Sequence, residues 1–222
     1  MEHRIIDHHI DSLRDKVLLL GGKAESAVLR AMQALALRDS KLAQTVLDED
    51  KIINQIELDI DRMSVEIIAR YQPAAHDLRL VIAVAKITPV LERLADHASN
   101  IADAVLTINT EPELRQFPEM TVMSNVAAEM LRNALDAFIA EDAERSRQII
   151  KQDRVIDINY KKVFSDLIAM IINDPTTTTS AAQLLFVAKH LERIGDYVKD
   201  ICELTVYLVE ASIIKHSASD GA

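Results

Sequence analysis

Apolar residues recur along this chain at intervals of three and four positions, the spacing that places them on one side of an α-helix. Six stretches with this pattern are separated by turn signals such as Asp39-Ser40, Gln72-Pro73 and Asp174-Pro175. Proline disfavours the helical region for the residue before it, so the two signals with proline mark helix ends, and Asp39-Ser40 indicates a turn and a helix cap. The pattern predicts an all-α protein with helices over residues 5–37, 41–71, 75–107, 121–140, 142–173 and 181–215.

One short motif occurs twice, one hundred positions apart: Leu91-Glu92-Arg93-Leu94-Ala95-Asp96 and Leu191-Glu192-Arg193-Ile194-Gly195-Asp196. Earlier segments also match between the halves, because Asp50-Lys51-Ile52-Ile53-Asn54 resembles Asp153-Arg154-Val155-Ile156-Asp157. Repeated supersecondary units of this kind indicate internal duplication. We therefore predict two repeated three-helix bundles, at residues 1–108 and 120–216. Residues 109–119, with Pro112 and Pro118, would form the linker, and residues 217–222 a small, polar, disordered tail.

Two features interrupt predicted helices. Gly21-Gly22 falls inside the first helix and should weaken or bend it. Pro89 lies just before the first motif, where it removes a backbone hydrogen bond and should kink the third helix. At the amino terminus His3, His8 and His9 are interpreted as a solvated end rather than a metal site.

Composition narrows the class of protein further. The chain has 222 residues, of which 49% are hydrophobic, and a formal net charge of −10 at pH 7. This charge argues against nucleic acid or an anionic bilayer as the main partner, because both attract basic surfaces. No apolar run approaches the ~20 residues of a membrane span, and the amino terminus lacks a signal-peptide core. We expect a soluble, cytoplasmic protein without membrane insertion, in which the lone Cys202 is a quiet, partly buried thiol.

Each motif begins a stripe of oxygen-bearing side chains at helical spacing. The first stripe is Glu92, Asp96, Asn100 and Asp103, and the second is Glu192, Asp196, Asp200 and Glu203. Apolar residues form a packing seam on roughly the opposite side of each helix. The first seam is Leu91, Leu94, Ala98, Ile101 and Val105; the second is Leu191, Ile194, Val198, Ile201, Thr205 and Leu208. Each motif helix should therefore pack by one side and show carboxylates on the other.

Carboxylates on the preceding helix of each hairpin should lie level with these stripes. Asp50 and Asp96 lie equally far from the turn near Pro73, as do Asn54 and Glu92, and the turn near Pro175 similarly pairs Asp153 and Asp157 with the second motif. Acids on two adjacent helices can surround one cation, and oxygen ligands suit Mg, Ca, Mn or Fe. The candidate metal ligands are Asp50, Glu92, Asp96, Asp153, Asp157, Glu192, Asp196 and Asp200.

The alternative interpretation is a solvated charged face, which is common on exposed helices. Recurrence of the pattern in both halves favours metal binding, because clustered carboxylates repel unless a cation or proton intervenes. Without a cation we predict raised carboxyl pKa values or splayed side chains. His97 is a possible extra ligand, and Arg93 and Arg193 are expected to pair within their own helices.

These residues resemble the PhoU family. The resemblance rests on Gln72-Pro73-Ala74-Ala75-His76-Asp77-Leu78-Arg79-Leu80, on Leu91 to Ala102, and on the second motif, and it covers about residues 5–214. It implies two three-helix bundles and a cytoplasmic accessory regulator in bacteria. Such a regulator restrains the phosphate-specific ABC transporter and the sensor histidine kinase of the two-component system that drives phosphate-starvation genes.

The resemblance also implies a homodimer and iron or zinc on the acidic stripes. Together with the preference of oxygen ligands for hard cations, this makes Fe, Zn, Mn and Mg the candidate ions. Carried over by position, Glu92, Asp96, Glu192 and Asp196 match the family motif, whereas Asn54 is a weaker ligand where an acid would be expected. The chain departs from the family at Pro89-Val90, in place of a polar pair, and at Tyr197, in place of histidine. These departures bear on metal identity and on partner contacts of the first bundle.

Two other functions compete with a non-enzymatic regulator. A helical-bundle di-metal oxidase would use Glu-x-x-His motifs in its core, and none occurs here. A structural dimerising protein would carry the stripes as solvated surface only. The sequence shows neither a nucleophile constellation nor a glycine-rich loop that cradles phosphate.

Overall fold

The computed structural model describes residues 4–212 and confirms the all-α prediction. The described part contains six long α-helices and no strand. The helices are α1 (Ile5–Leu37), α2 (Ser40–Tyr71), α3 (Ala75–Ile108), α4 (Pro118–Ala140), α5 (Ala143–Asn173) and α6 (Thr178–Glu210), with a short 3-10 turn, η1 (Pro175–Thr177), before α6. No helix in this part is long and apolar enough to cross a membrane.

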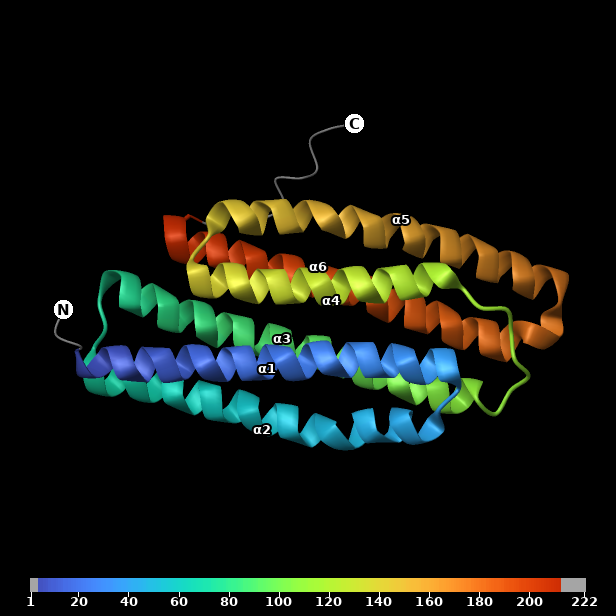
Figure 1. The fold of residues 1–222 in the computed structure, drawn as a ribbon, viewed down its shortest axis with the longest axis horizontal. Helices are drawn as coiled ribbons and strands as arrows, with labels where there is room; N and C mark the ends of the chain where they lie inside the picture. Colours follow the sequence, from blue (N-terminus) through green and yellow to red (C-terminus); the bar gives the residue numbers. More distant parts are fainter. Residues whose placement is uncertain (1–3, 213–222) are drawn as a thin grey trace.

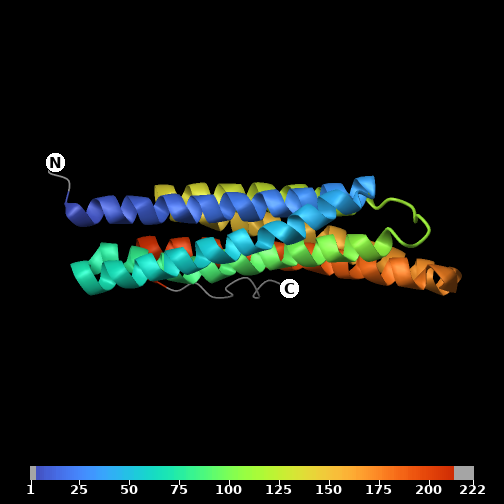
Figure 2. The same cartoon turned by 90° about the horizontal axis from the view of Figure 1, so that it is seen from below.

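The helices form two three-helix bundles that lie along each other. Helices α1, α2 and α3 make the first bundle and α4, α5 and α6 the second, and Figures 1 and 2 show all six running lengthwise. The bundles meet where α3 packs against α6 and α1 against α4. The duplication predicted from the repeated motif is therefore visible in the fold, but the extensive contact between the two halves was not predicted.

The packing seams predicted for the two motif helices are buried. Every residue of both seams is at most 1% exposed. Burial of aliphatic side chains contributes about 25 cal/mol per Å² of apolar surface removed from water, so these seams orient α3 and α6. Once the seams face inward, the 3.6-residue period directs the acidic stripes toward the outside of the bundles.

Several helix ends differ by a few residues from the prediction, for local reasons. Helix α4 begins at Pro118 because proline is favoured in the first helical turn, which shortens the linker to residues 109–117. Helix α6 begins at Thr178 rather than at residue 181, because Asp174 and Pro175 start a 3-10 turn that leads into the helix. Helix α6 ends at Glu210, short of residue 215. The predicted tail at residues 217–222 and His3 lie outside the described residues.

Both irregular features expected inside helices are accommodated within continuous helices. Helix α1 runs through Gly21, and a Cβ added at Gly21 would lie only 2.2 Å from Cδ1 of Leu135 on α4. A larger residue at this position would therefore displace the Leu135 side chain, which packs against Gly21 where α1 and α4 approach each other closely. Helix α3 likewise continues through Pro89. Cys202 is fully buried, where the sequence analysis expected partial burial, and this burial raises the pKa of its thiol to about 12.

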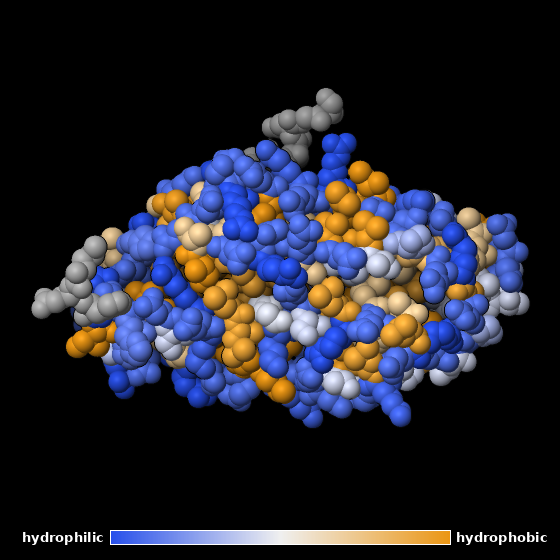
Figure 3. All heavy atoms as spheres, viewed as in Figure 1, coloured by the Kyte–Doolittle hydropathy of each residue, from blue (hydrophilic) through white to orange (hydrophobic). Residues whose placement is uncertain are grey.

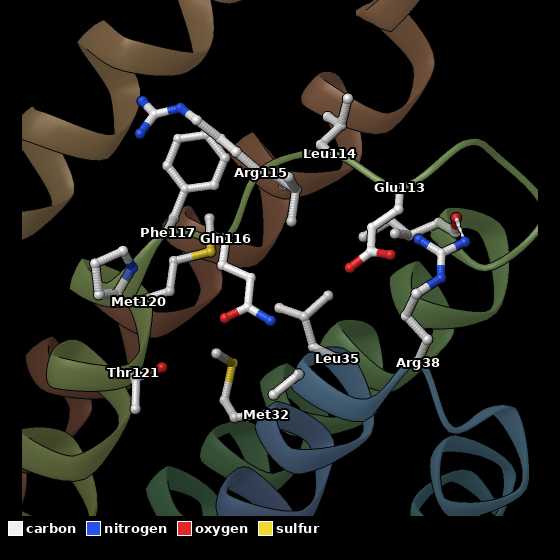
Figure 4. Close-up of a pocket in the computed structure, with 14 residues that line it drawn as sticks. Met32, Leu35, Arg38, Glu113, Leu114, Arg115, Gln116, Phe117, Met120 and Thr121 are labelled. Carbon is white, nitrogen blue, oxygen red and sulfur yellow. Dashed lines mark hydrogen bonds between the residues drawn. The ribbon is translucent and has the colours of Figure 1, made fainter.

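The linker between the bundles encloses a cavity of about 110 Å³ beside the end of α1 (Figure 4). Arg38 holds the linker in place by donating hydrogen bonds to the carbonyl oxygens of Ile108, Asn109 and Glu111 at 3.2, 3.2 and 2.7 Å. Phe117 and Met120 close the opposite side. None of the predicted metal ligands lines this cavity.

Candidate functional site

Four carboxyl groups gather on the α2–α3 hairpin and form what we call the first acidic cluster. Asp50 and Glu57 come from α2, and Glu92 and Asp96 come from α3. Asp50 lies near enough to Glu92 and Asp96 to perturb both electrostatically, and Glu57 does the same to Glu92. The carboxyl groups of α2 and α3 thus lie beside each other, as predicted from their equal distances along the chain to the turn.

Three carboxyl groups of the first acidic cluster, those of Glu57, Glu92 and Asp96, have raised pKa values. Partial burial, followed by the charges of Asp96, Glu57 and Asp50, raises the pKa of Glu92 to about 7. Burial and the charge of Asp50 raise the pKa of Asp96. Burial and the charges of Asp61 and Asp96 raise that of Glu57. This is the predicted behaviour of clustered carboxylates in the absence of a cation.

Polar neighbours complete the first cluster. The Ser99 hydroxyl donates to Oδ1 of Asp50 at 3.1 Å, and the Asn54 amide donates to Oδ2 of Asp50 at 3.1 Å. The amide oxygen of Asn54 is buried without a hydrogen-bond partner. An unsatisfied oxygen beside carboxylates is a donor set that suits a hard cation or a bound water.

The corresponding groups in the α5–α6 hairpin are arranged differently, and we call Asp153, Asp196 and Lys199 the second acidic cluster. The Lys199 ammonium lies 2.5 Å from Oδ2 of Asp153 and 2.7 Å from Oδ1 of Asp196. Asp153 is buried and its other oxygen, Oδ1, has no hydrogen-bond partner. Burial raises the pKa of Asp153, and the bond from Lys199 lowers it, so its carboxylate depends on the ammonium to remain ionised.

The other predicted ligands of the second half lie around this ion pair. Asp157 is half-buried, and its negative charge contributes to the raised pKa of Asp153. Glu192 pairs with Lys189 on its own helix, at 2.5 Å. Asp200 is exposed on α6. Arg193 pairs within its helix as predicted, reaching Asp196 and the Tyr197 hydroxyl at 3.4 Å each.

The two clusters differ in how well they would fit a metal ion. Within residues 4–212, no three His, Cys, Asp or Glu side chains are arranged to hold one. The first cluster brings together carboxylates from two helices and the orphaned Asn54 oxygen, the donor types that a hard cation prefers. In the second cluster the Lys199 ammonium already lies between the two carboxylates, and the residues do not fit an added cation.

His97 contacts the other bundle instead of joining a ligand set. Its Nδ1 lies 2.7 Å from Nδ1 of His190 on α6, and its ring stacks on Tyr197 with centroids 5.4 Å apart. Burial, the charge of His190 and that of Arg193 lower the pKa of His97 to about 4, and burial lowers that of His190. Both rings are therefore neutral at pH 7, and one Nδ1–H donates to the other ring.

Sequence reasoning missed three residues that shape the clusters. Glu57 lies seven positions after Asp50, a spacing that already placed it on the same side of α2. Ser99 and Lys199 follow the motif Asp by three positions in each half. A comparison of the two copies position by position would have revealed the exchange of a hydroxyl for an ammonium.

The fold and its repeated clusters define a class: duplicated three-helix-bundle proteins with a Glu-x-x-x-Asp stripe on the third helix of each bundle. The PhoU domain model matches the chain twice, at residues 17–105 and 120–205, and the chain belongs to the PhoU family.

Relatives and solved structures agree with this assignment. The chain is 33% identical to the phosphate-specific transport system accessory protein PhoU of Escherichia coli, over 95% of this chain and 88% of that protein. It is also 33% identical to a PhoU homolog of Clostridium acetobutylicum, over 94% and 96% of the two chains. The crystal structure of PhoU from Pseudomonas aeruginosa superposes with a TM-score of 0.89 at 35% identity, covering 93% of this chain and 99% of that one.

Proposed function

We propose that this protein is a non-enzymatic negative regulator of phosphate uptake and of phosphate-starvation signalling. The observation that carries the proposal is the match of both halves to the PhoU domain, together with relatives named as accessory proteins of the phosphate-specific transport system. Under this proposal the protein works in the cytoplasm, where it contacts the phosphate ABC transporter and the sensor histidine kinase when phosphate is plentiful.

Surface composition supports a role through protein contacts. Large apolar side chains are exposed on several helices, and Figure 3 shows apolar patches interleaved with polar residues on one side of the molecule. Several of these exposed apolar side chains belong to helix α5, namely Val155, Ile158, Phe164, Ile168 and Ile172. Exposed apolar groups rimmed by polar residues are typical of protein-binding surfaces. A homodimer and the two regulatory partners are the occupants that the proposal assigns to such surfaces.

We further propose that a divalent or trivalent metal ion acts on the first acidic cluster. Asp50, Glu92 and Asp96 would supply carboxylate ligands, with Glu57 and the Asn54 oxygen beside them. Burial and, after it, mutual repulsion raise the pKa values of Glu92 and Asp96. A bound cation would relieve this repulsion and would order the acidic surface for a partner. Fe, Zn, Mn and Mg remain the candidate ions, of which the oxygen-rich donor set favours the harder ones.

The test is repression of a phosphate-starvation reporter in a bacterial strain that lacks its own PhoU and carries this gene, grown in high phosphate. The wild-type gene should repress the reporter. The double variant E92Q/D96N should lose repression if the first cluster is a functional surface, whereas the matched variant E192Q/D196N reports on the second half. Circular dichroism and protein abundance establish that each variant is folded and present.

Each result decides a separate part of the proposal. Failure of the wild-type gene to repress would contradict the regulatory function. Full repression by E92Q/D96N would leave the regulatory function standing but refute the role of the first cluster. Co-purification of the wild-type protein with the kinase or with the transporter tests the contacts directly.

A further inference from the structure

The internal duplication allows the two acidic clusters to be compared position by position. Glu92 and Asp96 correspond to Glu192 and Asp196, one hundred residues later, and the same offset pairs Ser99 with Lys199 and Ala95 with Gly195. The two hairpins differ at several positions, and these two pairs of positions lie one helical turn apart on the inner edge of the stripe. The consequence of both changes is visible in the geometry of Asp153.

Gly195 makes room for a buried carboxylate. A Cβ at position 195 would lie 2.4 Å from Oδ1 of Asp153, so only glycine permits Asp153 to lie as close to α6 as it does. In the first half the equivalent position is the fully buried Ala95, and Asp50 remains only half-buried. The side chain of Asp153, in contrast, is 6% exposed.

Lys199 supplies the charge that such burial demands. Its ammonium bridges Asp153 and Asp196 at 2.5 and 2.7 Å. Burial acts to lower the pKa of Lys199, but the hydrogen bonds to both carboxylates outweigh it and raise that pKa. A buried carboxylate without a partner is strongly destabilising. In the first half Ser99 donates one neutral hydrogen bond to Asp50 and brings no charge.

We propose that Lys199 is the resident cation of the second cluster, which is thereby neutralised from within and excludes metal ions, so that the two halves of this duplicated protein have different roles. Only the first cluster then responds to an external cation, and this part of the proposal rests on the proposed function. The assignment of Lys199 itself rests on its contacts and on the coupled Gly195. An ammonium and a metal ion cannot both lie between Asp153 and Asp196, because two cations at that distance repel and compete for the same oxygens.

Reciprocal exchange of the two residues tests the proposal, with MnCl₂ as the probe. Lys199→Ser should lower the melting temperature in EDTA by about 6 to 20 °C, since it leaves Asp153 buried without a counter-charge. Added Mn²⁺ should restore that loss, and calorimetric titration should show one more bound ion per chain than in the wild type. Ser99→Lys should raise the melting temperature in EDTA and remove the Mn²⁺ binding of the first cluster.

Lys189→Ser is the matched control. Lys189 lies on the same helix, and its ammonium pairs with one carboxylate of the same stripe, Glu192, and lies 5.4 Å from the centroid of the Tyr160 ring. Its side chain is 48% exposed, against 28% for Lys199. This variant should change neither the melting temperature nor the number of bound ions. If Lys189→Ser gains an ion as Lys199→Ser does, the effect is general charge removal and the proposal is wrong.

The remaining outcomes are also decisive. The proposal would be overturned if the Lys199→Ser protein binds no additional Mn²⁺ and has the melting temperature of the wild type. It would also be overturned if the E192Q/D196N substitutions reduce the Mn²⁺ binding of the wild type. If Lys199→Ser does not fold, the Ser99→Lys variant decides: a higher melting temperature in EDTA supports the proposal, and an unchanged or lower one contradicts it. A wild type that binds no Mn²⁺ refutes the metal role in the proposed function, while the gain in Lys199→Ser still tests Lys199.

Discussion

Replacing Glu92 by glutamine should stabilise the metal-free protein, although the residue belongs to the motif that marks the family. Glu92 carries a pKa of about 7 in the folded state, against an ordinary value of 4.5. The folded protein thus holds the proton of Glu92 more tightly than the unfolded chain does. Between pH 4.5 and pH 7 the unfolding free energy falls as pH rises, and above pH 7 the full penalty of the ionised group is present.

The size of the effect follows from the same values. A difference between about 7 and 4.5 corresponds to about 3.4 kcal/mol at 1.36 kcal/mol per pH unit. Because Glu92 is partly exposed, solvent screening reduces this figure, and we expect about 1–2 kcal/mol. E92Q should therefore unfold at higher urea than the wild type at pH 8 in EDTA. At pH 5, where the carboxyl group is largely protonated in the folded protein, the difference should shrink toward zero.

The assay is urea unfolding followed by circular dichroism at 222 nm, at pH 5 and pH 8, with and without MnCl₂. The control is E192Q, which removes the equivalent carboxylate of the second half, where Glu192 pairs with exposed Lys189; a change within about 0.5 kcal/mol is expected. The reasoning is refuted if E92Q is no more stable than the wild type at pH 8, or if its gain is the same at both pH values. With Mn²⁺ the wild type should be more stable than E92Q, since the Glu92 carboxylate is a better metal ligand than a glutamine amide.

Three further predictions concern single positions. Gly195→Ala should lower the unfolding free energy by about 1–3 kcal/mol in urea unfolding, because the new methyl group displaces Asp153. The reciprocal variant Ala95→Gly should cost only about 1 kcal/mol, through lower helix propensity. Equal effects of the two substitutions would show that Asp153 is not confined. Asp39→Ala should cost about 1 kcal/mol, since Asp39 accepts hydrogen bonds from two amides of the first turn of α2; thermal melting measures it, and an unchanged melting temperature would contradict the capping role. Cys202 should not react with a thiol reagent until the protein unfolds, because it is fully buried and its thiol pKa is raised to about 12; rapid labelling of the native protein would contradict this.

Local patterns in the sequence were sufficient for the elements and for much of the candidate site. The 3-4 spacing of apolar residues is a direct consequence of helix geometry, so the buried seams of α3 and α6 could be predicted from residue spacing alone. The proximity of Asp50 to Glu92 and Asp96 could be predicted by counting residues from the turn near Pro73. In two antiparallel helices joined by a short turn, residues equally far from the turn lie side by side. Helix ends were predicted less well where proline and Asp174 reshape a turn, as at α4 and α6.

How the halves meet, and what each cluster contains, depends on packing in three dimensions. The amino-acid sequence specified six amphipathic helices, their duplication and two acidic stripes, because each of these depends on periodicity within a segment or on similarity between segments. The packing of α3 on α6, the contact that brings His97 to His190, and the close approach at Gly21 depend on residues far apart in the chain. The same holds for Lys199, which is an ordinary charged residue in the sequence. Its role emerges only where two helices bring a buried carboxylate within 2.5 Å of its ammonium, since the interaction of charges depends on their separation and burial in space.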